Sequence, residues 1–153
     1  MTTTARRPLK FESLDQVMPD VDRLLQGHRT VGNWSLAQIC NHLTVAIVGS
    51  VEGCSKKAPW LIRKTLGPFV LKRLMKTEQI DEGIKTLDEF VPKPGLDSRA
   101  EAEALRAALR LFAAAPGPMA EHSFFGSLSR NAWDRLHRVH CAHHLSFALP
   151  EPA

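Results

Sequence analysis

One stretch near the C-terminal end, residues 133–147 (WDRLHRVHCAHHLSF), contains four of the chain's seven histidines. At 3.6 residues per helical turn, His140 and His144 lie one turn apart on the same side of a helix. Trp133, Leu136 and Phe147 follow the same spacing, so the rest of this face is apolar. Two imidazoles therefore occupy positions that an amphipathic helix normally gives to leucine.

A pair of histidines four residues apart can bind one divalent ion, because one helical turn places both rings on the same side. A buried imidazole without a partner costs about 1–3 kcal/mol. An ion that accepts a lone pair from each neutral ring removes this cost. The other interpretation is a pair of core histidines hydrogen-bonded to the backbone or to carboxylates on facing helices. The spacing alone leaves both interpretations open.

Apolar residues recur at helical spacing in three further segments, and each begins with a capping box that satisfies free backbone amides. The pairs are Ser13 with Gln16, Ser35 with Gln38, and Ser98 with Glu101. Ser129 can cap the C-terminal helix. The predicted helices span residues 14–25, 36–53, 98–112 and 129–147. No segment shows the alternation of a strand.

Four amphipathic helices in 153 residues predict one all-α domain over residues 1–153, a four-helix bundle. Short turns join the first helix to the second and the third to the fourth, so each pair should be antiparallel. The connection between the second and third helices has about 45 residues and can cross the length of the bundle. The N-terminal residues 1–11 are polar and small, and we expect them to be loose.

Residues 56–76 of this crossover contain seven Lys or Arg and no acidic residue, with aromatic and aliphatic residues between them. Gly67 and Pro68 should divide the segment into two short helices. We favour a crossover whose apolar residues cap the bundle and whose charges are solvated. The alternative is a surface for an acidic partner, nucleic acid or an anionic membrane. A net charge of +4 is small for a nucleic-acid-binding protein, and no stretch is long enough to span a membrane. We therefore expect neither as a partner.

A metal site in a bundle needs ligands from a second helix, and His42 is the only histidine in the first three predicted helices. It lies at the edge of that helix's apolar stripe, where an ordinary half-buried residue is the simpler interpretation. His137 and His143 flank the apolar face of the last helix, and His28 and His122 lie in turns, where histidines are usually solvated. No carboxylate has a spacing that ties it to this face, so no general base can be named.

Cysteine usage favours the cytoplasm. The three cysteines (Cys40, Cys54 and Cys141) are odd in number and have no CxxC spacing, which is typical of reduced thiols. The first residues lack the apolar segment of a secretory signal. Cys40 lies within the apolar stripe of its helix, and Cys141 should point away from the helix interface. We interpret both as packing residues rather than nucleophiles.

Several short motifs resemble the DinB-like (YfiT-like) metalloenzyme superfamily, most closely one of its branches of unknown function. They are GNWSL at residues 32–36, NHL at residues 41–43, FGSLS at residues 125–129, Trp133, and HCAHHL at residues 140–145. The resemblance extends over residues 11–150. Two positions depart from it: Phe147 stands where wider family members often have Gln, and Ser123 where this branch tends to have Pro.

The resemblance implies an up-down-down-up bundle and a divalent metal ion bound by His42, His140 and His144. Zn²⁺ or Ni²⁺ is the expected ion, and Fe²⁺ also suits imidazole. It implies a metal-dependent transferase or hydrolase acting on a small molecule, with a low-molecular-weight thiol as cosubstrate, and a homodimer. The alternative is a non-catalytic binding or scaffold module with a structural ion or none.

Overall fold

The computed structural model describes residues 5–82 and 88–153. Helices dominate the described residues, and a small two-stranded sheet accompanies them. The α-helices are α1 (Val17–Gln26), α2 (Leu36–Glu52), α3 (Trp60–Lys64), α4 (Leu66–Thr77), α5 (Ser98–Ala114) and α6 (Arg130–Leu145). The 3-10 turns are η1 (Leu14–Gln16) and η2 (Asp88–Phe90), and the strands are β1 (His28–Thr30) and β2 (Ala148–Pro150).

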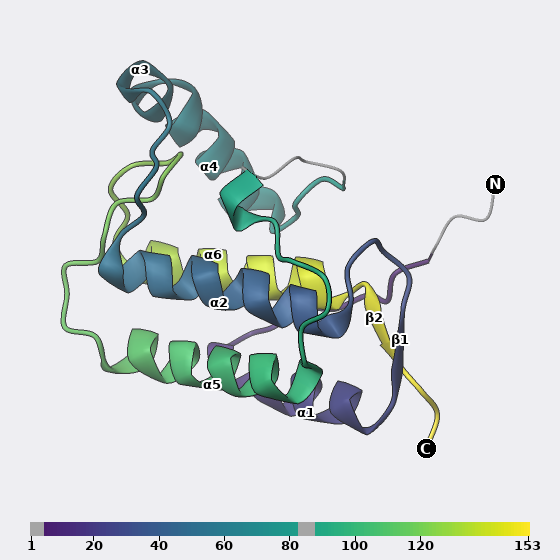
Figure 1. Ribbon diagram of the computed structural model, residues 1–153. Coiled ribbons are helices and arrows are strands. Elements are labelled where there is room, and N and C mark those ends of the chain that lie inside the picture. Colours follow the sequence, from purple (N-terminus) through teal and green to yellow (C-terminus); the bar gives the residue numbers. More distant parts are fainter. Residues whose placement is uncertain (1–4, 83–87) are drawn as a thin grey trace.

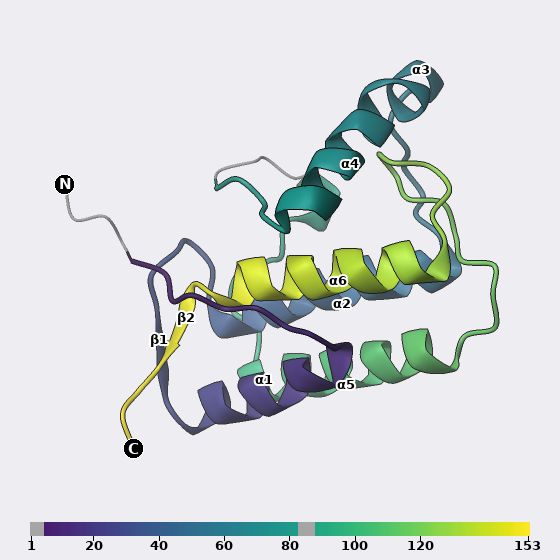
Figure 2. The same cartoon turned by 180° about the vertical axis from the view of Figure 1, so that it is seen from behind.

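Four helices, α1, α2, α5 and α6, lie alongside one another and share one core (Figure 1). α1 and α6 run toward the small sheet, whereas α2 and α5 run away from it, so the two predicted antiparallel pairs are present. Figure 2 shows the same arrangement from behind. Fully buried side chains from all four helices fill the core, including Val21, Leu24, Leu36, Leu43, Leu105 and Leu145.

The helix ends follow the predicted signals in part. Ser35 and Ser129 cap α2 and α6 by accepting from the backbone amides three residues ahead. The prediction for α5 was wrong, because Asp97 rather than Ser98 is the cap, and its carboxylate accepts from the Ala100 amide at 2.8 Å. A carboxylate competes well for this place since it also complements the positive end of the helix dipole.

The sheet was not predicted. β1 and β2 pair in antiparallel register, with His28 opposite Pro150 and Thr30 opposite Ala148. Three-residue strands are too short to show alternation, so the sequence carries no signal for them. The last helix also ends at Leu145, two residues before the predicted limit.

The N-terminal residues were expected to be loose, and for residues 5–11 this was wrong. Phe11 is buried in the core, and the Arg7 amide donates to the Ser146 carbonyl at 3.0 Å. The Arg7 guanidinium binds both carboxylate oxygens of Asp20 on α1. Residues 1–4 lie outside the described residues.

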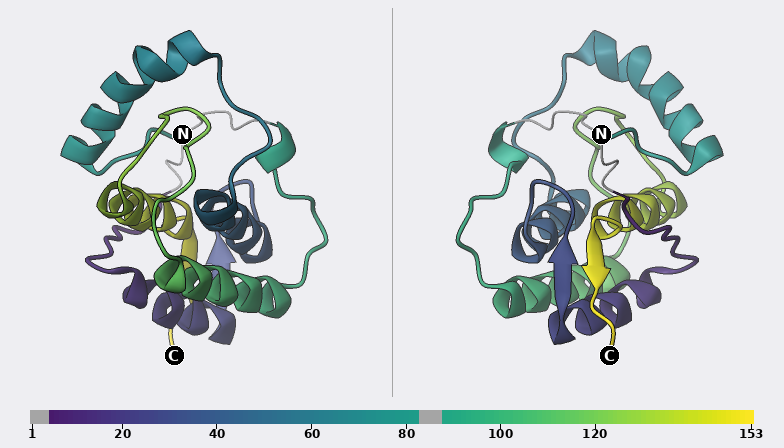
Figure 3. Two further views of the ribbon diagram at one scale, coloured as in Figure 1. Left: turned by 90° about the vertical axis from the view of Figure 1, so that its left-hand side faces the viewer. Right: turned by 90° about the vertical axis from the view of Figure 1, so that its right-hand side faces the viewer.

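The crossover differs from the prediction in two ways. The break between α3 and α4 falls at Thr65, and Gly67 and Pro68 lie in the first turn of α4, where a proline needs no hydrogen-bond donor. Leu74 and Met75 pack against the core as expected. Four other apolar side chains, Trp60, Leu61, Leu66 and Phe69, are exposed and do not cap the bundle. Figure 3 shows α3 and α4 on the opposite side of α2 and α6 from α1 and α5.

Candidate metal centre

The structure brings the three predicted ligands together between α2 and α6. The ring centroids of His42 lie 5.0 Å from His140 and 4.6 Å from His144, and those of His140 and His144 lie 4.7 Å apart. One nitrogen from each ring lies within 4.8 Å of the other two. Two helices far apart in sequence thus place three imidazoles around one point.

A backbone carbonyl fixes the orientation of His42. Its Nδ1 lies 2.9 Å from the Phe90 carbonyl oxygen, and since a carbonyl can only accept, Nδ1 carries the hydrogen. The lone pair is therefore on Nε2, which lies 3.1 Å from His140 Nε2. A carbonyl on the far nitrogen is the usual way in which proteins orient a metal-binding histidine.

Trp34 forms one wall of the cluster. Its ring stacks on His144 at 5.3 Å and is tilted against His42 at 4.9 Å. Trp34 and the Phe90 carbonyl were both missed as site residues. The carbonyl belongs to the backbone and has no sequence signal, whereas Trp34 stands directly before the Ser35 cap and appeared only as part of a motif.

The nitrogen separation between His42 and His140 fits a shared ion. Two nitrogens each bound about 2.0–2.1 Å from one ion are about 2.8–3.4 Å apart at angles between a right angle and a tetrahedral one. The 3.1 Å between His42 and His140 falls in this range. His42 is buried, whereas His140 and His144 are half-buried.

Burial keeps the three rings neutral. It lowers the pKa of His42 and of His140, and it lowers the pKa of His144 to about 2. The neighbouring imidazoles reinforce the shift at His140 and His144, because two protonated rings at this distance repel. Neutral imidazole is the form that donates a lone pair to a metal, so the cluster is ready to bind one at neutral pH.

A family model for proteins of unknown function, DUF1569, matches residues 3–151. The chain belongs to the DUF1569 family. No curated protein and no solved structure matches it. Among the described residues, no helix is both long enough and apolar enough to cross a membrane.

Two further histidines of this DUF1569 member are structural. His137 donates from Nε2 to Ser50 Oγ at 2.9 Å, because the Ser50 hydroxyl itself donates to the Ile47 carbonyl. His122 was expected to be solvated, but it is largely enclosed, and its Nδ1 accepts from the amides of Phe124 and Phe125 at 3.0 Å each. Burial lowers the pKa of His137 to about 3 and that of His122 to about 4.

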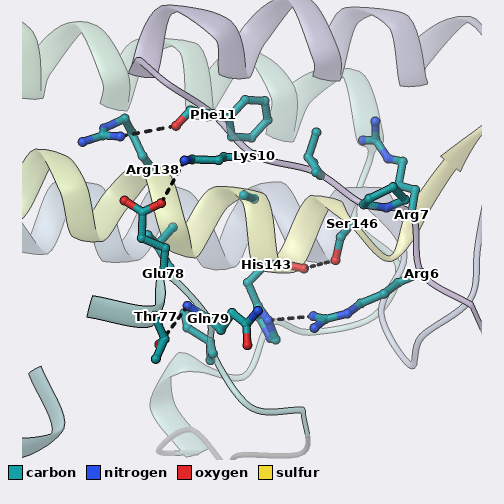
Figure 4. A pocket seen from close by; sticks show the side chains of 15 residues that line it. Arg6, Arg7, Lys10, Phe11, Thr77, Glu78, Gln79, Arg138, His143 and Ser146 are labelled. Carbon is teal, nitrogen blue, oxygen red and sulfur yellow. Dashed lines mark hydrogen bonds and ion pairs between the residues drawn. The ribbon is translucent and has the colours of Figure 1, made fainter. Parts of the chain in front are cut away.

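His143 borders both the cluster and a neighbouring cavity. Its ring is edge-on to His144 with centroids 4.8 Å apart, and its Nδ1 accepts from the Arg6 guanidinium at 3.1 Å. The cavity has a volume of about 660 Å³ and lies between α6, the N-terminal segment and the end of α4 (Figure 4). Among the described residues that line it, the charged ones are mainly cationic, with Arg6, Arg7, Lys10 and Arg138 against the acid Glu78.

The cysteines Cys40 and Cys141 lie in the core. Cys141 was expected to point away from the helix interface, but it is fully buried because α6 is enclosed on several sides. Burial raises the pKa of both thiols to about 12, so they stay protonated and are neither ligands nor nucleophiles. No carboxylate among the described residues hydrogen-bonds to His42, His140 or His144.

Proposed function

We propose that this DUF1569 member is a divalent-metal-dependent enzyme whose ion is bound by His42, His140 and His144. The observation that supports this most directly is the convergence of three neutral imidazoles from two helices, with two Nε2 atoms 3.1 Å apart. Zinc and nickel suit such a ligand set. Three protein ligands are typical of catalytic sites, which keep a coordination position open for water or substrate.

We also propose that the four long helices form the four-helix bundle of the DinB-like superfamily, with the order up-down-down-up. The directions of α1 and α6 against α2 and α5 support this proposal. So does the placement of the ligands, since one lies near the middle of the second long helix and two lie on the last. Internal sites in bundles are commonly built from side chains on facing helices in this way.

The proposed reaction is a transfer or hydrolysis on a small molecule, with transfer of a low-molecular-weight thiol as the first activity to test. When bound, the ion would supply Lewis acidity and lower the pKa of a coordinated water or thiol. The Phe90 carbonyl holds His42 in position, and Trp34 excludes water from one side of the rings. The ligand number of three favours a catalytic centre over a structural one, which is usually closed by four protein ligands.

The metal content of purified protein tests the proposal. Protein prepared without a nickel column should contain about one divalent ion per chain by elemental mass spectrometry. His140→Ala should lose most of it. His28→Gln serves as the control, because His28 lies in β1 and its Nδ1 contacts the Leu24 carbonyl. Metal content far below one ion per chain in the wild type, or unchanged by His140→Ala, would contradict the proposal.

Chelation separates a catalytic ion from a structural one. Stripping a structural ion should lower the melting temperature sharply, because its binding free energy is folding free energy. Here the large apolar core does not depend on the cluster, so we expect a modest loss of stability and a complete loss of activity in the thiol-transfer assay. A collapse of the fold on chelation would instead support a scaffold with a structural ion.

A further inference from the structure

The crossover has four large exposed apolar residues that are close in sequence. Trp60 and Leu61 on α3 are 65% and 63% exposed, and Leu66 and Phe69 on α4 are 50% and 70% exposed. They lie within ten residues of sequence, on α3 and the first half of α4, whereas Leu74 and Met75 near the end of α4 pack against the core. Several exposed apolar residues on neighbouring helices mark a binding surface more often than scattered single residues do. We call residues 56–77 the α3–α4 arm.

Basic side chains surround this apolar group. The α3–α4 arm contains seven Lys or Arg and no acid. Leu66, Phe69 and Arg73 share one face of α4 at steps of three and four residues, with Lys72 and Lys76 beside them. Lys64, Lys72, Arg73 and Lys76 form no ion pair with any residue that the structure describes. This face of α4 is therefore apolar in the first half of the helix and cationic in the second half.

Several contacts tie the α3–α4 arm to the loop before α6. The Ala58 amide donates to the Ser123 carbonyl at 2.7 Å, and Arg63 pairs with Glu121 at 3.0 Å. Gly67 packs so closely on the Phe124 carbonyl that a Cβ there would lie 2.5 Å from its oxygen. These contacts fix the inner side of the arm to the loop before α6, so its apolar outer side cannot fold back onto the core.

We propose that the α3–α4 arm docks on an anionic phospholipid membrane. Trp60, Leu61, Leu66 and Phe69 would enter the boundary between headgroups and acyl chains, and the basic residues would contact lipid phosphates. Tryptophan, phenylalanine and leucine beside lysine and arginine are the composition of helices that lie in a membrane interface. The inference is independent of the proposed metal chemistry.

Charge and polarity favour an anionic membrane as the partner of this surface over a second copy of the chain or a nucleic acid. A second copy of the arm would bring two cationic faces together, which is unfavourable. Nucleic acid would satisfy the basic residues but would leave four exposed apolar side chains without a partner. An anionic membrane satisfies both, and cytoplasmic leaflets carry the negative potential that attracts such segments.

Vesicle binding of the full chain tests the proposal. The protein should sediment with vesicles of phosphatidylcholine and phosphatidylserine, but weakly or not at all with phosphatidylcholine alone. Added salt should weaken the binding, because each basic residue near the surface contributes about fivefold through screened attraction. The emission of Trp60 should shift to shorter wavelength on binding, and Trp60→Phe should bind while losing this shift.

Two variants with matched controls identify the surface. Leu66→Ser with Phe69→Ser should weaken vesicle binding at least about tenfold, from the apolar area that no longer leaves water. The control is Leu111→Ser, an exposed leucine on α5. Lys64→Gln with Lys72→Gln should weaken binding about 25-fold.

The corresponding charge control is Arg99→Gln with Arg110→Gln on α5, both exposed. All the variants alter exposed side chains, so their melting temperatures should match that of the wild type. Absence of binding to anionic vesicles at low salt would overturn the proposal, as would equal weakening by the α5 controls. So would a dimer in sedimentation that Leu66→Ser with Phe69→Ser converts to a monomer, or binding to DNA in preference to vesicles.

Discussion

Replacing His137 with glutamine should make the metal-free protein less sensitive to acid. His137 is fully buried, and its ring donates to Ser50 Oγ while packing against Trp133 and Phe112. Burial lowers its pKa from the ordinary 6.5 to about 3. A glutamine amide can still donate to the Ser50 oxygen, but it cannot take up a proton. The variant therefore removes the ionisable group while keeping the hydrogen bond.

The direction of the pH dependence follows from whether the unfolded or the folded chain binds the proton. Below pH 6.5 the unfolded chain protonates His137 and the folded chain does not, so the free energy of unfolding falls as the pH falls from about 6.5 toward 3. Between pH 7.5 and pH 5 this one ring should lower the free energy of unfolding by about 2 kcal/mol. The value at pH 5 depends on the unfolded pKa alone, provided that the folded pKa stays below about 4.

Urea unfolding followed by circular dichroism, with chelator present, gives the measurement. The wild type should lose about 2 kcal/mol more than His137→Gln between pH 7.5 and pH 5. Ser50→Ala is the control, because it leaves the His137 N–H without its acceptor and costs about 1–3 kcal/mol at every pH. The pH dependence of its free energy of unfolding should remain that of the wild type. Equal pH slopes for the wild type and His137→Gln would refute the reasoning.

Three further predictions concern packing, helix capping and metal binding. Gly67→Ala should destabilise by about 1–3 kcal/mol in urea unfolding, because the new Cβ meets the Phe124 carbonyl, whereas helix propensity alone would stabilise by about 1 kcal/mol. Arg130→Gln should cost about 1–3 kcal/mol in the same assay, because Arg130 donates to three carbonyls at the end of α5, and exposed Arg110→Gln should cost little. Zinc at a hundredfold excess over its dissociation constant should stabilise the wild type by about 2.7 kcal/mol and should not stabilise His42→Ala.

The sequence predicted the helical part of the site because helices have a fixed period. His140 and His144 share a face wherever the helix begins, so small errors in its limits do not matter. The third ligand, His42 on α2, was harder to predict. His42 lay only at the edge of its apolar stripe, and its approach to α6 depends on how the two helices pack, which one sequence does not encode locally.

Other features had no local signal at all. The strands β1 and β2 have three residues each, and they pair only because the chain leaving α1 and the chain leaving α6 run past each other in opposite directions. The exposed arm was misinterpreted for a related reason. Its apolar residues have helical spacing, which normally indicates burial, but spacing does not say whether the other elements leave a surface to cover them.

The positions of the ring hydrogens decide whether the three-histidine cluster can bind an ion. His42 has its hydrogen on Nδ1, which donates to the Phe90 carbonyl, so its Nε2 is an acceptor. The 3.1 Å contact with His140 Nε2 is then a hydrogen bond only if His140 carries its hydrogen on Nε2. A ligand nitrogen must instead offer a lone pair.

We therefore expect both His42 and His140 to carry their hydrogens on Nδ1 in the zinc-bound protein, so that each Nε2 offers a lone pair to the ion. Nitrogen chemical shifts of the imidazole rings distinguish the two tautomers, and His140→Ala assigns the signals. His137 is the internal reference, because its Nε2 donates to Ser50 and lies outside the cluster. Unchanged His140 signals at saturating zinc would show that Nε2 of His140 binds no ion, and the three-histidine site would then lose the contact on which its geometry rests.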